Sequence, residues 1–217
     1  MLTNKILIIG LSMFSVFLSD CRWFGVRGNG HIESESRAIT DFSEIYADGM
    51  FDVEWQQGAP ALTVKCDENL LNYVEASVSD NRLRLHVRER ILPTHGLKVT
   101  VTSSTRTGAK LRGASELKAQ NLTGQSFAVE TTGAADVTLD GAVDFLLADM
   151  TGASDLKAKS LQVKTAEIST TGAADAEVSP SESLRVNITG AGSVLYHGQP
   201  KNIEKHVTGA GEVRHKD

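Results

Sequence analysis

The chain contains 217 residues, of which 41% are hydrophobic and 23% charged, and its formal net charge is −5. This composition is too apolar for a disordered chain and too rich in charges for a polytopic membrane protein. The acidic balance, without a block of Lys and Arg, excludes nucleic acid as the expected partner. Two cysteines are too few for a disulfide framework, and the length predicts one domain with or without a leader.

The first residues have the features of an export signal. Lys5 precedes the uncharged apolar run 6–18, which is shorter than the roughly 20 residues that a membrane-spanning helix needs. A run of this length is typical of the apolar core of a signal peptide, so residues 1–20 are predicted to be one.

Leu18-Ser19-Asp20-Cys21 is similar to a bacterial lipobox. Cys21 is therefore expected to carry a lipid and to begin the mature chain, which gives membrane contact through an N-terminal lipid. The alternative is ordinary cleavage nearby, since Asp20 replaces the usual small residue. We expect an exported protein, located in the outer membrane as a lipoprotein, in the periplasm or at the cell surface.

The next residues, 21–36, are rich in glycine and polar side chains, and we expect them to tether the anchor to the fold. Residues 37–105 alternate polar and apolar side chains without regular glycines, which predicts irregular coils and a cap. Within them we predict an early coil at 47–53, strands at 61–66, 82–87 and 97–101, a short helix over 67–74 with Asp67 as its N-cap, and a hairpin turn at Asp80-Asn81.

The segment 106–217 repeats one motif six times. The first glycines of the copies are 18 to 20 residues apart: Gly113, Gly133, Gly152, Gly172, Gly190 and Gly209. A fixed period near 20 is typical of a solenoid. No Gly-Lys-Ser/Thr phosphate loop follows them, so we expect these glycines at structural turns that need positive φ or close stacking of coils.

Side chains around each glycine alternate with period two. Val186 and Ile188, four and two residues before Gly190, flank the polar Asn187, and the other copies follow the same pattern. Thr107, six residues before Gly113, occupies the inward column of Phe127 and Leu146. The alternation predicts an all-β fold, a single-stranded parallel β-helix with coils of 18–20 residues, expected to be right-handed, and an N-terminal cap region. Lys205 and His215 interrupt the inward pattern in the last coils, which predicts a polar end.

Three segments resemble one known family. Thr40-Asp41-Phe42-Ser43-Glu44-Ile45, Asp67-Glu68-Asn69-Leu70-Leu71 and the recurrent Gly-Ala-x-Asp motif are similar to those of the head GIN domain family of auto-transporter adhesins. The resemblance covers residues 37–215, so 37–217 is interpreted as a head GIN-like domain. It implies a β-helix and export to the envelope of Gram-negative bacteria, often as a lipoprotein. It implies no established catalytic residue, and we predict no cofactor.

An acidic residue stands three positions after most of the repeat glycines. Stacking of the coils would place these acids in one column: Glu116, Asp136, Asp155 and Asp175, followed by Ser193 and Glu212. One hypothesis is that the column binds a ligand or a divalent cation that relieves its repulsion. The interpretation we favour is that each acid hydrogen-bonds nearby backbone amides and keeps the corner solvated, because one acid per coil is few for a metal site. The six histidines have no metal-ligand spacing, so no metal site is predicted.

Two classes of function remain. The leading hypothesis is a non-enzymatic interaction or adhesion surface in the cell envelope, with an unidentified protein or glycan as partner. The alternative is a carbohydrate-active enzyme, a polysaccharide lyase or hydrolase, on the same scaffold. Few aromatic residues follow residue 100, and sugar-binding enzymes usually stack sugars on exposed aromatics. A structural envelope protein without a discrete ligand fits the sequence as well as the leading hypothesis does.

Overall fold

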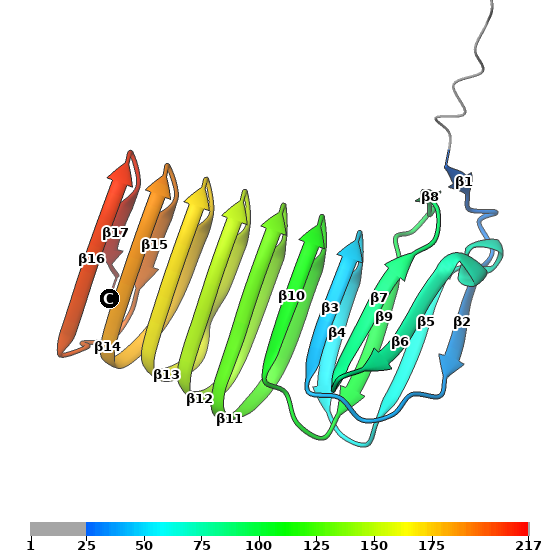
Figure 1. Ribbon diagram of the computed structural model, residues 1–217, viewed down its shortest axis with the longest axis horizontal. Helices are drawn as coiled ribbons and strands as arrows, with labels where there is room; N and C mark the ends of the chain where they lie inside the picture. Colours follow the sequence, from blue (N-terminus) through cyan, green and yellow to red (C-terminus); the bar gives the residue numbers. More distant parts are fainter. Residues whose placement is uncertain (1–24, 217) are drawn as a thin grey trace, which may run out of the picture.

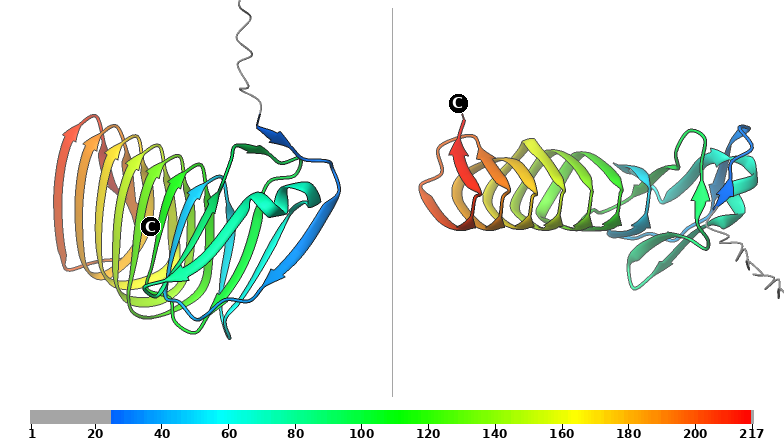
Figure 2. Two further views of the ribbon diagram at one scale, coloured as in Figure 1. Left: turned by 45° about the vertical axis from the view of Figure 1, so that its right-hand side comes forward. Right: turned by 90° about the horizontal axis from the view of Figure 1, so that it is seen from above.

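The computed structural model describes residues 25–216 and is an all-β solenoid with an N-terminal sheet region at one end (Figure 1). The predicted signal peptide and Cys21 lie outside the described residues. Seen from above in Figure 2, the coils form a single row, and the N-terminal sheet region lies at one end of it. The predicted parallel β-helix is confirmed, because neighbouring strands of the repeat segment pair in parallel.

Each regular coil consists largely of one long, bent strand. These strands begin at the acidic residue after one repeat glycine, pass a second corner, and end at the next repeat glycine. The repeat segment begins with β10 (Gly108–Gly113), and the long strands are β11 (Glu116–Gly133), β12 (Asp136–Gly152), β13 (Asp155–Gly172) and β14 (Asp175–Gly190). Shifts in register fall in the second corner, for example between Ala119 and Leu122, so that corner absorbs the variation in repeat length.

The last coil is divided into shorter strands. β15 (Ser193–Tyr196) and β17 (Glu212–His215) continue one face of the solenoid, and β16 (Asn202–Gly209) continues the other. β16 pairs with β14, and β17 pairs with β15. Every residue of β16 is exposed, so this coil ends the hydrophobic core.

The first coil lies in the N-terminal half, as predicted for residues 47–53. β3 (Glu44–Gly49) pairs with β10, and β4 (Asp52–Gln57) pairs with β11. The chain then leaves the stack to build the cap and returns at β10. This excursion contains β5 (Ala61–Asp67), the 3-10 helix η1 (Glu68–Tyr73), β6 (Val74–Ser79), β7 (Arg82–Val87), β8 (Ile91–Leu92) and β9 (Lys98–Ser103).

The cap combines parallel and antiparallel pairing. β7 and β9 lie parallel to β3 and β4, whereas β6 and β5 pair antiparallel to β7 and β9. The predicted turn at Asp80-Asn81 is confirmed, since both residues have positive φ, 51° and 61°, between antiparallel strands. The predicted helix is present as a 3-10 helix, but Asp67 does not hydrogen-bond its first turn.

Asp67 instead holds the N-terminal segment on the fold. Its buried carboxylate accepts hydrogen bonds from the N–H groups of Gly30 and Thr94, at 2.8 and 2.9 Å. Burial opposes ionisation, but these bonds and that of the Thr94 hydroxyl outweigh it and lower the pKa of Asp67.

The described part of the predicted tether therefore belongs to the fold, and that expectation is wrong for residues 25–36. β1 (Val26–Arg27) pairs with β8, and β2 (Ile32–Arg37) pairs antiparallel with β5. The glycines and polar side chains of this segment fit the cap because the carboxylate of Asp67 and the amide of Asn69 provide hydrogen-bond partners for its backbone.

The inward columns form the core as predicted in the regular coils, whereas the predicted inward residues Ile203 and Val207 of the last coil are exposed. A further correction lies at the junction with the cap. Thr107 is exposed, and Arg106 is buried at 5% exposure. The regular alternation begins only with β10, so the side chain of Thr107 remains outside and donates a hydrogen bond to the carbonyl of Ser43. The Arg106 guanidinium donates to the carbonyls of Trp55, Gln120 and Asn121 at 3.1, 2.8 and 2.6 Å, and burial lowers its pKa.

Two threonines point into this core without a hydrogen-bond partner for their hydroxyls. Thr131 and Thr170 are 1% and 2% exposed, and the oxygen of each hydroxyl is buried and unpaired. Thr131→Val should therefore raise the free energy of unfolding by about 1 kcal/mol, because valine keeps the shape and removes the unsatisfied group. Urea unfolding measures the change. The adjacent exposed residue provides the control, and Thr132→Val should stay within about 0.5 kcal/mol of the wild type.

The strand register places each repeat glycine next to the repeat glycine of the neighbouring coil, and all six have positive φ. At Gly152, φ is 115°, and a Cβ would lie 2.2 Å from the carbonyl oxygen of Gly133. Gly124 also has positive φ, 145°, but no atom lies within 4 Å of its Cβ position.

Gly152→Ala should lower the free energy of unfolding by more than about 3 kcal/mol, whereas Gly124→Ala should cost only the backbone strain of about 1–2 kcal/mol. Thermal and urea unfolding of the two variants compare these costs. Equal losses would mean that φ alone, and not the approach of the coils, requires glycine at position 152.

Candidate functional site

The acidic column predicted from the repeat is present as one row along the stack. Register places Glu116, Asp136, Asp155 and Asp175 on successive coils. The structure adds Asp52, which pairs with Glu116 from the first coil. The sequence contained a signal for this residue, because Asp52 follows Gly49 by the same three positions that separate Glu116 from Gly113.

Basic side chains compensate part of this negative charge. The Lys118 ammonium lies 2.7 Å from the carboxylate of Glu116, and that of Lys157 lies 3.2 Å from the carboxylate of Asp136. The hydrogen bond to Glu116 raises the pKa of Lys118. These pairs are about half exposed and contribute little to stability, but they reduce the repulsion within the column.

Asp175 hydrogen-bonds to the following coil. One of its carboxylate oxygens accepts hydrogen bonds from the backbone N–H and the hydroxyl of Ser193, each at 2.7 Å. The favoured interpretation expected bonds to nearby amides, and at this position the bond reaches across to the next coil instead. Within residues 25–216, no group of three or more His, Cys, Asp or Glu side chains is arranged to hold a metal ion.

The second corner of the coils forms a groove, which we call the corner groove, with a volume of about 430 Å³. Its residues come from successive coils, so it runs along the stacking axis. Val143, Val163 and Pro180 give it an apolar floor, and the ion pair of Lys164 with Asp144, at 2.7 Å, lies on its wall. The remaining lining is largely small or neutral polar, and includes Gly124, Ala142, Gln162, Ser179, Ser181, Gly198 and Gln199.

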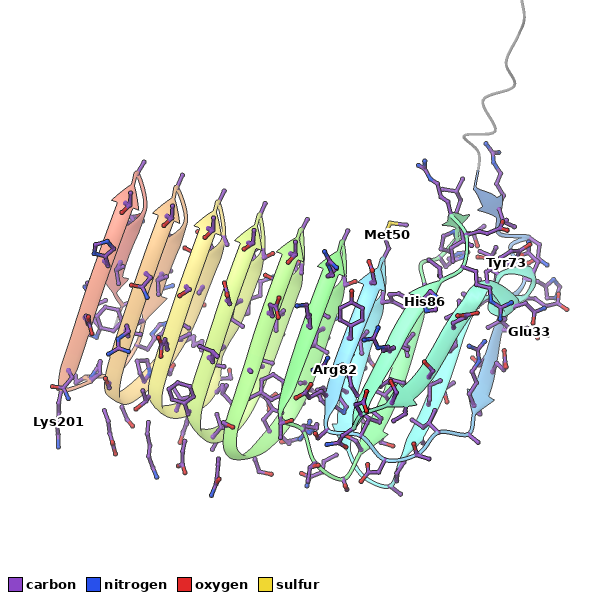
Figure 3. All side chains as sticks on the ribbon, in the orientation of Figure 1. Glu33, Met50, Tyr73, Arg82, His86 and Lys201 are labelled. Carbon is purple, nitrogen blue, oxygen red and sulfur yellow. The ribbon has the colours of Figure 1, made fainter. Side chains whose placement is uncertain are left out.

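A second groove, of about 270 Å³, lies on the face formed by β3, β10, β11 and β12. Small residues, Gly108 and Ala128, line it, and charged side chains surround it. Arg82, which forms an ion pair with Glu44, is labelled on this face in Figure 3. Neither groove could be predicted from the sequence, because each depends on which small residues meet across coils.

A column of threonines covers the outer side of the repeat-glycine corner. Register aligns its five members, and all are exposed: Thr132, Thr151, Thr171, Thr189 and Thr208. Outward columns of this kind repeat one chemical group at each coil, about 4.8 Å apart.

Cys66, the cysteine within the described residues, is buried beside Leu62 and Val64 as predicted. Burial raises the pKa of its thiol to about 11, so it is protonated at neutral pH and poorly nucleophilic. No helix among residues 25–216 has the length and apolar character needed to cross a bilayer.

These features define a parallel β-solenoid with one closed end, an acidic column and shallow grooves along its flanks. Residues 41–200 match the family model described as "Putative auto-transporter adhesin, head GIN domain". The chain therefore belongs to the head GIN domain family, and the resemblance in its motifs is confirmed.

Solved structures share this fold. A putative adhesin from Bacteroides fragilis is 20% identical with a TM-score of 0.71, over 88% of this chain and 100% of the other. A putative adhesin from Parabacteroides merdae is 20% identical with a TM-score of 0.54, over 88% and 99% of the two chains. A putative lipid binding protein from Parabacteroides distasonis is 22% identical with a TM-score of 0.50, over the same shares. No curated protein matches this chain.

The ion pairs along the acidic column predict that it needs no divalent cation. A site with a Kd of about 50 μM would gain about 2.7 kcal/mol at about 5 mM Ca²⁺, which would raise the Tm by several degrees. We expect no rise in the Tm at this concentration, measured by calorimetry against Mg²⁺ and EDTA. A rise in the Tm with Ca²⁺ that is lost in Asp155→Asn would contradict this prediction and would identify the acidic column as a cation-binding site.

Proposed function

We propose that this protein is exported, anchored through a lipid on Cys21, and acts as a non-enzymatic interaction surface in the cell envelope. Membership of a family described as adhesins supports the binding role. The observation that carries the proposal is the repetition of outward groups along the stack, seen in the threonine column and in the corner groove.

Such a surface suits an extended partner, a protein segment or a glycan. A ligand that lies along the stack meets equivalent groups on successive coils, and several weak contacts then act together. The corner groove adds an apolar floor with neutral polar walls, which is a surface that can contact the faces and the hydroxyls of sugars or a peptide backbone.

The experiment is protease accessibility of the tagged protein in intact cells, with Cys21→Ala alongside. We expect digestion of the wild-type protein by external protease and release of Cys21→Ala into the medium, because the variant lacks the attachment site. A periplasmic soluble marker protein that stays intact is the control for cell integrity.

Protection until the outer membrane is opened would overturn surface adhesion and place the protein in the periplasm. Retention of Cys21→Ala with the membrane would contradict the lipid anchor. The carbohydrate-active enzyme is tested separately with Asp155→Asn, since an enzyme that uses this carboxylate would lose all polysaccharide cleavage, whereas a binding surface tolerates a single change.

A further inference from the structure

The last coil leaves the stack open at one end. Within residues 25–216, β16 and β17 have a neighbouring strand on one side only. At the other end β2, β5 and β6 form the cap, in which β2 and β6 also have a single neighbour, β5 and β7 respectively (Figure 1). Ile203 and Val207 are 42% and 40% exposed at this end, although the equivalent residues of the coil below, Leu184 and Ile188, are buried. A strand edge of this kind is a template for pairing with another strand.

The backbone groups that face the open side can be identified from the hydrogen bonds on the other side. Ala210 and Glu212 donate their N–H groups to the carbonyls of Gly190 and Gly192 in the previous coil. In a parallel ladder, successive residues direct their backbone groups alternately to the two sides. Ile203, Lys205, Val207 and Val213 therefore direct theirs to the open side.

Both edge strands carry an acidic and a basic side chain on either side of a central residue. In β16, Glu204 and His206 flank Lys205, and in β17, Glu212 and Arg214 flank Val213. Glu212 and Arg214 form an ion pair with each other, and Glu204 pairs with Arg185 of the coil below at 3.0 Å, so a second copy would extend these pairs into larger clusters of charge. The two central residues face each other across the coil, because the Lys205 ammonium lies 3.4 Å from the carbonyl oxygen of Val213. A single line through Lys205 and Val213 therefore passes through the centre of β16 and the centre of β17.

We propose that this end pairs with the same end of a second copy, through antiparallel strands related by a two-fold axis along that line. The axis places Ile203 opposite Val207 of the second copy, and Glu204 opposite its His206. On the other edge it places Glu212 opposite Arg214 of the second copy. The residues whose backbone groups face the open side fall in hydrogen-bonded pairs. The acidic and basic residues that flank Lys205 and Val213 fall in the closer, non-hydrogen-bonded pairs.

Lys205 lies opposite Lys205 of the second copy and is the unfavourable element of this arrangement. Its ammonium lies 5.0 Å from the centre of the Tyr196 ring and near the carbonyl of Val213, so both contacts hold the charge within its own coil. An inward lysine also discourages edges from pairing with unrelated strands, so it favours the specific register over non-specific aggregation.

Sedimentation velocity of the full chain with Cys21→Ser, in a mild nonionic detergent and over about 1 to 100 μM, tests association. We expect a dimer that Glu212→Arg weakens at least tenfold, because arginine then faces Arg214 of the second copy. Glu212→Arg with Arg214→Glu should restore it. Glu33→Arg makes the same charge change at the closed end (labelled in Figure 3) and should leave association unchanged.

A cross-link tests the register in the same background. Glu204→Cys with His206→Cys places cysteines in the close antiparallel pairs, within the Cα separation that a disulfide requires, and oxidation should give a covalent dimer. In the variant Glu204→Cys alone, the cysteine lies opposite His206 of the second copy, so this variant should remain uncross-linked.

A protein that stays monomeric at the highest concentration would overturn the proposal. A dimer that is indifferent to Glu212→Arg, or cross-linking by the single cysteine, would also overturn it. Circular dichroism of each variant shows that the exposed substitutions leave the solenoid folded.

Discussion

The close approach of successive coils at the repeat glycines determines the rest of the structure. Each glycine stands where a side chain would meet the carbonyl oxygen of the glycine in the neighbouring coil, and φ is positive along the whole column. Because glycine stacks on glycine, the register of every strand that leaves this corner is fixed. A slip of one residue would turn the aliphatic columns outward, so the core depends on this alignment.

The features that follow from the alignment of the repeat glycines could be predicted from the sequence, and the features that depart from it could not. Period two around each glycine was sufficient for the inward columns, because a coil can bury only one face of each strand. The junction with the cap departs from that pattern, since Arg106 enters the core only when three carbonyls are there to accept its hydrogen bonds. Asp67 is a similar case, because its partners Gly30 and Thr94 are distant in sequence.

The candidate site follows the same division. Five acids could be aligned from the repeat, four on successive coils and Glu212 beyond Ser193, and the pairing of Asp52 with Glu116 extends that column into the first coil. Lys118 pairs with Glu116 of its own strand, two residues away in the sequence. The pair of Lys157 with Asp136, and the grooves along the flanks, instead depend on which side chains meet across coils. The repeat thus makes the scaffold predictable from the sequence. The features that are specific to this chain lie where the repeat is interrupted: in the cap, at the second corner and in the last coil.

The two corners of each coil differ in how much variation in length they tolerate, and this difference has an evolutionary consequence. Shifts in register are confined to the second corner, so a coil can gain or lose residues there without disturbing the columns on either side. A whole coil is equally interchangeable, because each one contacts only its two neighbours. Duplication or deletion of a single coil would change the length of the molecule by about 4.8 Å and preserve its closed end. The length of the solenoid is therefore a property that tandem duplication can adjust in even steps.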